Sequence, residues 1–418
     1  MMPKESTLPL DAVPLRRKVP LSQPLRHARY RQLWLANLIS NLGTWMQTFA
    51  SAWLITTVAD SASASTLVQT AAYVPIFLFA LFAGVIADKV DRPQFLFFCN
   101  LTMALCACTM AAVVATDHAS AGPVLALTFL MGACSAFMWP AWQACMSGLV
   151  EPNEVEAAAT LNNLSYNVAA VAGPALGGLL FGLVGPGSLF LINAFSFLGL
   201  LAVYWSWWRE PRAREAPSGA SFAASLRTGL RTAFGCARYR RILANVCTVF
   251  FASIAFASLL PVFVKTELQL DSSVFGLLMG SLGAGAVLGA CLLPHVRPYV
   301  SKTGLLAGAL LLFGAMLLVL PFLRSVTLMV PLIVAGGMAW SATVSTMNAA
   351  AQLSFPQAVR ARTLSIYLLV MAAAYTLGSV AWGYLADHFG VRAALACAGA
   401  CILVNGVVLL TARREHAI

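Results

Sequence analysis

The sequence predicts an all-α membrane protein with twelve transmembrane helices in two bundles of six. Three observations support this fold class. Of the 418 residues, 60% are hydrophobic and 10% are charged, whereas about 25% of residues in soluble domains are charged. Apolar stretches of about twenty residues recur along nearly the whole chain, and each is long enough to cross a hydrocarbon core of about 30 Å as a helix. The first half of the sequence also resembles the second.

Twelve segments have the required length. In the first half we expect spans at 32–57, 66–87, 94–115, 122–147, 155–183 and 187–207, and in the second half at 241–264, 272–294, 301–321, 325–350, 361–386 and 391–412. Many contain Gly, Pro, Ser or Asn, which membrane helices tolerate because neighbouring helices satisfy the freed backbone groups. A transmembrane β-barrel would instead show alternating segments of about ten residues.

These spans divide the chain into five regions. We expect a disordered polar tail at 1–28, a six-helix bundle at 29–207, a hydrophilic and partly helical linker at 208–238, a second bundle at 239–412 and a short tail at 413–418. The first apolar run is too long for the core of a signal peptide, so no cleaved signal is predicted.

The two halves repeat each other in sequence. The segment YRQLWLAN at 30–37 matches YRRILAN at 239–245, and a shift of 204 residues places Gly132 on Gly336 and Pro152 on Pro356. Pairing each helix with the one six positions later gives a parallel repeat about an axis along the membrane normal, as in many transporters. A substrate cleft is then expected between the halves at mid-depth.

Basic residues predict the orientation. All 26 Lys and Arg residues except Lys265, Arg324 and Arg392 fall in termini and loops on one side of the membrane. By the positive-inside rule, both termini and the linker are predicted to be cytoplasmic, in a multi-pass protein of the cytoplasmic (inner) membrane. The net charge of +11 comes from these basic residues, which are expected to face the anionic lipids of the cytoplasmic leaflet. No nucleic-acid partner is therefore expected.

The segment GVIADKVDR at 84–92 concentrates charge between apolar runs. It resembles the loop between helices 2 and 3 of the major facilitator superfamily, whose pattern is Gly-x-x-x-Asp-(Arg/Lys)-x-Gly-(Arg/Lys)-(Arg/Lys). Gly84, Asp88, Lys89 and Arg92 match this pattern, whereas Asp91 and Pro93 depart from it. The resemblance implies that Asp88 lies close to the start of helix 11, which Arg360 and Arg362 precede.

We therefore expect these charged residues to form a cytoplasmic latch between the halves when the cleft opens outward. A helix N-terminus carries unpaired N–H groups and partial positive charge that would attract the Asp88 carboxylate. The alternative is a topogenic loop whose acidic residues are incidental.

The segment AGPALGG at 172–178 resembles a helix-5 signature of exporters in the same superfamily. Gly173, Pro174, Gly177 and Gly178 carry this resemblance. Longer matches at 26–54, 140–150 and 173–198 resemble the subgroup of enterobactin and macrolide exporters known as transmembrane secretion effectors. The motif would bend helix 5 and allow close approach to the other half, although small residues are common at any membrane helix contact.

Polar and aromatic residues within spans are expensive unless they face a cavity or a partner. The candidates for the substrate cavity are Asn37, Asn41, Trp45, Gln47, Gln69, Tyr73, Trp139, Trp142, Gln143, Asn163, Tyr166, Asn167, Asn245, Asn348, Gln352, Tyr367 and Tyr375. Any one of them is more often an interhelical hydrogen-bond partner than a ligand contact. As a set, neutral amides and aromatic rings favour a bulky, amphiphilic organic ligand.

The sequence predicts a secondary exporter of a drug-like or siderophore-like molecule, which we expect to be a monomer. No Gly-x-x-x-x-Gly-Lys-(Ser/Thr) loop occurs, so neither ATP hydrolysis nor a cofactor is expected. The resemblance implies proton antiport, although no carboxylate lies deep within a predicted span. Asp88 and Asp387 are therefore the candidate coupling residues, and facilitated diffusion stays open. An importer of the same architecture is the alternative function, and scattered histidines without catalytic spacing argue against an enzyme.

Overall fold

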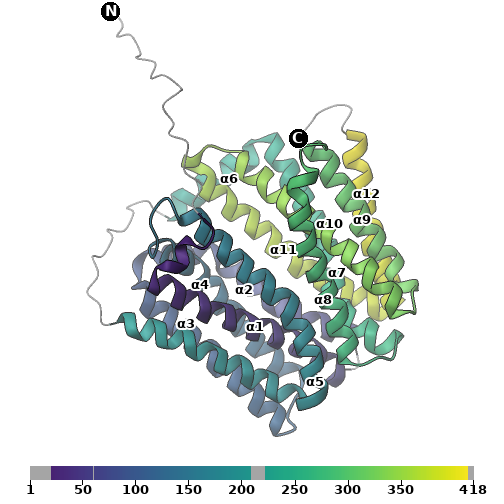
Figure 1. The fold of residues 1–418 in the computed structure, drawn as a ribbon. Coiled ribbons are helices and arrows are strands. Elements are labelled where there is room, and N and C mark those ends of the chain that lie inside the picture. The colour runs from purple at the N-terminus through teal and green to yellow at the C-terminus, as the bar shows by residue number, and fades with distance from the viewer. Residues whose placement is uncertain (1–19, 60, 209–221, 413–418) are drawn as a thin grey trace, which may run out of the picture.

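The computed structural model describes residues 20–59, 61–208 and 222–412, and these are helical nearly throughout (Figure 1). The helices are α1 (Ala28–Val58), α2 (Ala62–Lys89), α3 (Arg92–Ala115), α4 (Ala121–Ser147), α5 (Val155–Trp208), α6 (Phe222–Gly235), α7 (Ala237–Val262), α8 (Ser272–Val296), α9 (Lys302–Val319), α10 (Val326–Leu353), α11 (Gln357–Phe389) and α12 (Val391–Ala412). Short helical turns flank them at η1 (Gln23–Arg26), η2 (Phe263–Glu267) and η3 (Leu320–Phe322).

Polar side chains mark several helix starts. Ser61, Asp91, Asp271 and Ser301 precede α2, α3, α8 and α9, and each accepts a hydrogen bond from a backbone N–H of the following turn. Such caps satisfy backbone donors that have no partner within the helix. The helix starts are therefore encoded locally, at the ends of the apolar runs.

Helix α5 contains two spans. It has 54 residues, or about 80 Å at 1.5 Å per residue, which is far longer than one membrane crossing requires. Gly185 interrupts it with a φ of +75°, a conformation that glycine adopts readily because it has no Cβ. Pro186 follows directly. The break agrees with the separate spans predicted at 155–183 and 187–207.

The predicted twelve-span fold is confirmed. Ten of the described helices are long and apolar enough to cross a membrane when α5 is counted once. Dividing α5 at Gly185 adds a span, and α1 adds another, although its Asn, Gln and Thr residues make it more polar than the rest. The helix α6 lies in the predicted linker. Residues 1–19 of the predicted tail lie outside the described part, and residues 20–27 include η1.

The spans form two bundles that lie side by side, α1 to α5 in purple to teal and α7 to α12 in green to yellow (Figure 1). We call the end at which α1 begins and α12 ends the termini end, and the opposite end the far end. The largest apolar core fills the second bundle and includes Phe49, Ala52 and Trp53 of α1. The two halves therefore share part of one core.

Corresponding residues make corresponding contacts in the two halves. The Tyr30 hydroxyl of α1 donates to the Ala158 carbonyl of α5 at 2.9 Å, and the Tyr239 hydroxyl of α7 donates to the Thr363 carbonyl of α11 at 2.7 Å. Arg31 and Arg240 each donate to a backbone carbonyl six residues earlier in the chain. The repeated sequence at 30–37 and 239–245 thus forms the same local structure twice.

Candidate functional site at the interface between the halves

The first interface seam runs between α2 and α11. At the far end, the Asp387 carboxylate of α11 accepts hydrogen bonds from the Ala62 N–H at 2.7 Å, from the Ser63 N–H at 3.2 Å and from the Ser63 hydroxyl. Asp387 thereby caps the N-terminus of a helix in the opposite half. A carboxylate at this position is favourable because it pairs unsatisfied N–H groups and complements the positive end of the helix dipole.

The same seam continues to mid-depth. The Thr70 and Ser379 hydroxyls are hydrogen-bonded at 2.6 Å, and one turn further the rings of Tyr73 and Tyr375 lie 4.5 Å apart. Ser379 is buried and Thr70 is half-buried. Because each hydroxyl is the hydrogen-bond partner of the other, neither is left unpaired in the membrane interior. Tyr73 and Tyr375, predicted from sequence as cavity residues, therefore meet across the interface.

The second seam runs between α5 and α8 and depends on glycine. A methyl group added at Gly276 would lie 2.6 Å from the Pro174 carbonyl oxygen and 2.9 Å from the Gly178 Cα. Gly178 would be equally crowded, at 2.7 Å from the Ser272 carbonyl oxygen. Backbones can approach this closely only where side chains are absent. The helix-5 motif therefore contacts the opposite half directly.

The other two glycines of that motif face their own half. A methyl group at Gly177 would lie 3.0 Å from the Phe49 ring, and Gly173 packs against Trp45, both on α1. The motif thus wedges α5 between α1 and α8.

Contacts of α1 with η2 and α8 close the far end between these seams. The Lys265 ammonium of η2 donates to the Thr56 carbonyl of α1 at 2.5 Å. Below it, Phe275 of α8 stacks on Phe49 and Trp53 with ring centroids 4.7 and 5.6 Å apart. These inter-half contacts, like those of both seams, lie between the far end and mid-depth.

The predicted latch lies at the other end of the interface. The backbone of α2 includes Gly84, Asp88 and Lys89, but their side chains fall outside the described part of the structure. The Asp91 carboxylate caps α3 through the Gln94 N–H at 3.2 Å. Arg360 and Arg362 were expected to precede helix 11, but α11 begins at Gln357, so both lie within its first turns. The latch therefore stays a prediction.

The predicted cavity residues fall into four groups. Gln47, Trp142 and Tyr367 are buried within one half or the other. Asn37, Trp45, Tyr73, Tyr166, Asn245 and Tyr375 are only partly buried or exposed, and each makes a hydrogen bond or ring contact. Trp139, Gln143, Asn163, Asn167 and Gln352 are exposed on membrane-spanning helices, and Asn41, Gln69 and Asn348 are half-buried.

Gln47 illustrates the first group. It is 4% exposed, accepts a hydrogen bond from the Asn193 amide at 2.5 Å, and directs its own amide at the sulfurs of Met110 and Met131. These four residues lie on α1, α3, α4 and α5, so the Gln47 side chain joins four helices of the first bundle.

Sequence reasoning missed the capping role of Asp387, which it considered only for proton coupling. A signal was present. The segment GYLADH at 383–388 repeats the Gly-x-x-x-Asp-basic pattern of GVIADK at 84–89. The first ends α11 at the far end, and the second ends α2 at the termini end. The contact of Lys265 with α1 across the interface likewise could not be predicted, because in sequence Lys265 is only one of the few basic residues on its side of the membrane.

The sequence is similar to characterised transport proteins along nearly its whole length. The profile of the family described as transmembrane secretion effector matches residues 20–416. The staphyloferrin A transporter of Staphylococcus aureus is 24% identical over 355 residues, which cover 84% of this chain and 87% of that protein. The multidrug efflux pump Tap of Mycolicibacterium fortuitum is 23% identical over 385 residues, covering 89% and 93%.

Solved structures share the fold at low sequence identity. The nucleoside transporter NupG superimposes with a TM-score of 0.73 and 12% identity, covering 93% of this chain and 100% of that one. A bacterial homologue of the iron transporter ferroportin in an inward-facing state gives a TM-score of 0.72 and 14% identity, covering 92% and 98%.

Proposed function

The chain belongs to the transmembrane secretion effector family of the major facilitator superfamily, and from this premise we propose that it exports a small organic molecule by alternating access. It is a multi-pass membrane transporter, not an enzyme. The observation that carries the export proposal is the position of the AGPALGG motif. Gly178 and Pro174 of this exporter-like motif contact Gly276 across the interface, where the halves must move relative to each other.

The far-end closure represents one state of the transport cycle. Hydrogen bonds at Asp387 and Lys265 and the Phe275 stack join the halves there. In alternating access, the halves rock about a central site so that only one end opens at a time. In this state, with the far end closed, the transporter would bind its substrate from the termini end.

The termini end is proposed to face the cytoplasm, because the basic residues gather there. Single cysteines replacing Tyr299 and Arg324, which are exposed in loops at opposite ends, would test this in a background without the ten natural cysteines. A membrane-impermeant maleimide should label the Arg324→Cys protein in intact cells and the Tyr299→Cys protein only after lysis. The reverse pattern would invert the proposed orientation.

The substrate is proposed to be amphiphilic and partly aromatic. Polar side chains exposed on membrane-spanning helices, such as Gln143, Asn163 and Asn167, are costly against lipid and favourable beside water or ligand. Trp139 is 51% exposed and Tyr166 is 47% exposed, so aromatic surface accompanies these amides. Proton antiport is the proposed energy source, with Asp88 and Asp387 as candidate carriers.

Accumulation of dyes, macrolides and catecholate siderophores tests direction and coupling together. Cells that produce the protein should retain less of the transported compound than cells that do not, and an uncoupler should abolish the difference. Greater accumulation in producing cells would instead support the importer. Export that resists the uncoupler would refute proton coupling while leaving the exporter in place.

A further inference from the structure

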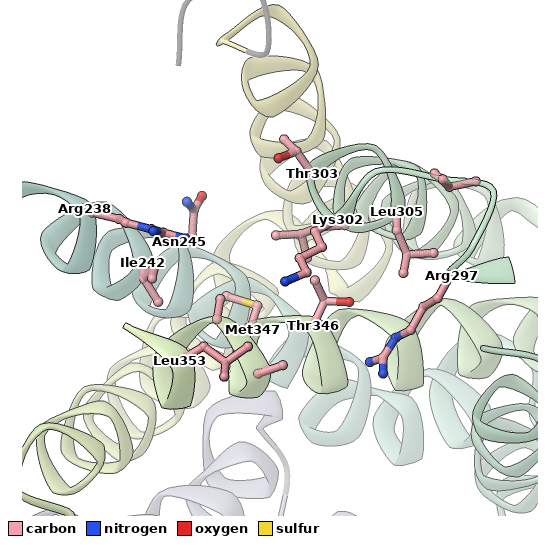
Figure 2. Close-up of a pocket in the computed structure, with 14 residues that line it drawn as sticks. Arg238, Ile242, Asn245, Arg297, Lys302, Thr303, Leu305, Thr346, Met347 and Leu353 are labelled. Atoms are coloured by element: carbon pink, nitrogen blue, oxygen red, sulfur yellow. The ribbon is translucent and has the colours of Figure 1, made fainter. Parts of the chain in front are cut away.

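A cavity of about 300 Å³ opens at the termini end of the second half, among α7, α9 and α10 (Figure 2). This volume is at the lower end of the range of about 300–1,000 Å³ for small-ligand pockets. Its walls are mostly apolar and include Ile242, Leu305, Met347 and Leu353. It is built within one half and does not belong to the inter-half seams.

Three cations from different segments surround this cavity. Arg238 lies at the start of α7, Arg297 follows α8, and Lys302 is the first residue of α9. Among the described residues that line the cavity, none is acidic. Within the described chain, the side chains of these three residues also make no hydrogen bond or ion pair. Unopposed positive charges of this kind create a strong local attraction for an anion.

A buried hydroxyl supplies a second and independent feature. Thr346 of α10 is 8% exposed, lines the same cavity, and its Oγ1 has no hydrogen-bond partner in the described structure. A buried hydroxyl without a partner is costly. Figure 2 shows Lys302 extending toward the face of α10 that carries Thr346 and Met347. An oxygen-rich ligand between them would accept hydrogen bonds from both.

We propose that this cavity binds the anionic headgroup of a membrane phospholipid. The three cations hold the phosphate, the Thr346 hydroxyl donates to one of its oxygens, and the apolar wall formed by Ile242, Leu305 and Met347 contacts the glycerol and the first acyl carbons. Basic pockets between membrane helices bind anionic headgroups by this combination. Free phosphate shares the anionic chemistry but gains nothing from the apolar wall.

Lipid retention by the purified full-length protein tests the proposal without a transport assay, so its failure is distinct from failure of the proposed export. The protein is reconstituted with phosphatidylethanolamine alone or mixed with phosphatidylglycerol, and bound lipid is counted by native mass spectrometry. Arg297→Gln and Lys302→Gln should each weaken phosphatidylglycerol binding about fivefold, equivalent to about 1 kcal/mol for one cation near the membrane surface. Both side chains are exposed, so the variants should fold normally.

Arg241→Gln is the matched control. Arg241 is exposed on the same end of α7 but does not line the cavity, so its loss should leave retention unchanged. An equal loss of phosphatidylglycerol retention in Arg241→Gln would show only a general attraction between the basic residues at the termini end and anionic lipid. That result would overturn the proposed site.

Two further arms identify the ligand. Thr346→Val, which keeps the side-chain shape, should reduce retention about tenfold or more, since a hydrogen bond to a charged group contributes about 1.5–3 kcal/mol net of competition with water. Unchanged retention in Thr346→Val would contradict a built headgroup site. Displacement of phosphatidylglycerol by millimolar inorganic phosphate would assign the cavity to a free anion and overturn the lipid.

Discussion

Asp387 performs between two halves of the molecule the role that a capping carboxylate usually performs within one helix. Its oxygens accept hydrogen bonds from the first turn of α2, 325 positions away in sequence. At the same end of the molecule, Asp271 caps its own helix α8 through the N–H groups of Ser273 and Val274. The two aspartates thus offer the same chemistry, but only Asp387 stabilises far-end closure.

Replacement of Asp387 should open the far end more often. Asp387→Ala removes the acceptor of the Ala62 and Ser63 N–H groups and leaves the Ser61 cap in place, and the loss of an N-cap costs about 0.5–2 kcal/mol. The ratio of far-end-open to far-end-closed molecules should rise by about twofold to thirtyfold. Spin labels at Val184 and Leu328, which are exposed at the far ends of the two halves, would report this as a longer inter-label distance.

Asp271→Ala is the control for this experiment. It removes a cap of similar chemistry without breaking a contact between halves, so the distance distribution should match that of the unmodified protein. The same shift in both variants would show that the measurement reports local fraying and not closure.

The Gln47 network should stabilise the first bundle. Asn193→Leu leaves the Gln47 Oε1 atom buried without its donor, and Gln47→Leu leaves the Asn193 amide unpaired. Each single substitution should therefore lower the free energy of unfolding. The amount should exceed half of the decrease caused by the double substitution. The coupling should be about 0.6–1.7 kcal/mol, as for other hydrogen bonds between membrane helices. A double-mutant cycle of unfolding in detergent measures it, and strict additivity would contradict the coupling.

At the scale of the helices, the close contact between α5 and α8 joins the two halves. The contact between α5 and α8 follows glycines on both elements, and Gly280 and Gly283 extend it to Ala175 and Val171. This contact is continuous from the far end toward mid-depth. Its closeness allows van der Waals packing to hold the helices together where the surrounding lipid is as apolar as the side chains.

A single methyl group in this contact should oppose closure. Gly276→Ala would place the new carbon 2.6 Å from the Pro174 carbonyl oxygen, and overpacking of this kind costs about 1–3 kcal/mol. Export should fall, and the distance between the far-end labels should increase.

Gly182→Ala is the matched control on the same seam. Its new methyl group would come no closer than 4.0 Å to the side chains of α8, so transport and distances should stay unchanged. Normal export by Gly276→Ala would show that this contact is looser during transport than in the closed state.

The positions of the spans could be predicted from sequence because crossing the membrane imposes about twenty apolar residues on every segment. The break at Gly185 was similarly signalled by the adjacent Gly and Pro. The sequence could not predict which face of each helix contacts another helix and which faces a cavity. Gln47 shows why, because a polar side chain in a span can meet either a ligand or a neighbouring helix, and only packing decides. The capping role of Asp387 could not be predicted because its partner, the start of α2, is remote in sequence.

At the scale of the whole molecule, the interface carries related motifs at opposite ends. GYLADH at 383–388 ends α11 beside the start of α2, and GVIADK at 84–89 ends α2 at the termini end. These two helices run in opposite directions along one seam, because Ala62 meets Asp387 and the later residue Thr70 meets the earlier residue Ser379. If Asp88 caps the start of α11 as predicted, a rocking motion would break one cap as it forms the other. The two end states would then differ little in free energy, which favours exchange between them.

A reversible cross-link across the α2–α11 seam should stop transport. The Thr70 and Ser379 oxygens lie 2.6 Å apart, so cysteines at both positions in a cysteine-free background should form a disulfide when the far end is closed. Oxidation should abolish export and a reductant should restore it, because the linked halves cannot separate there. Each single-cysteine variant should be insensitive to oxidant. Export at the normal rate by the fully cross-linked protein would mean that substrate leaves without opening this seam, and would exclude rocking about the central cleft.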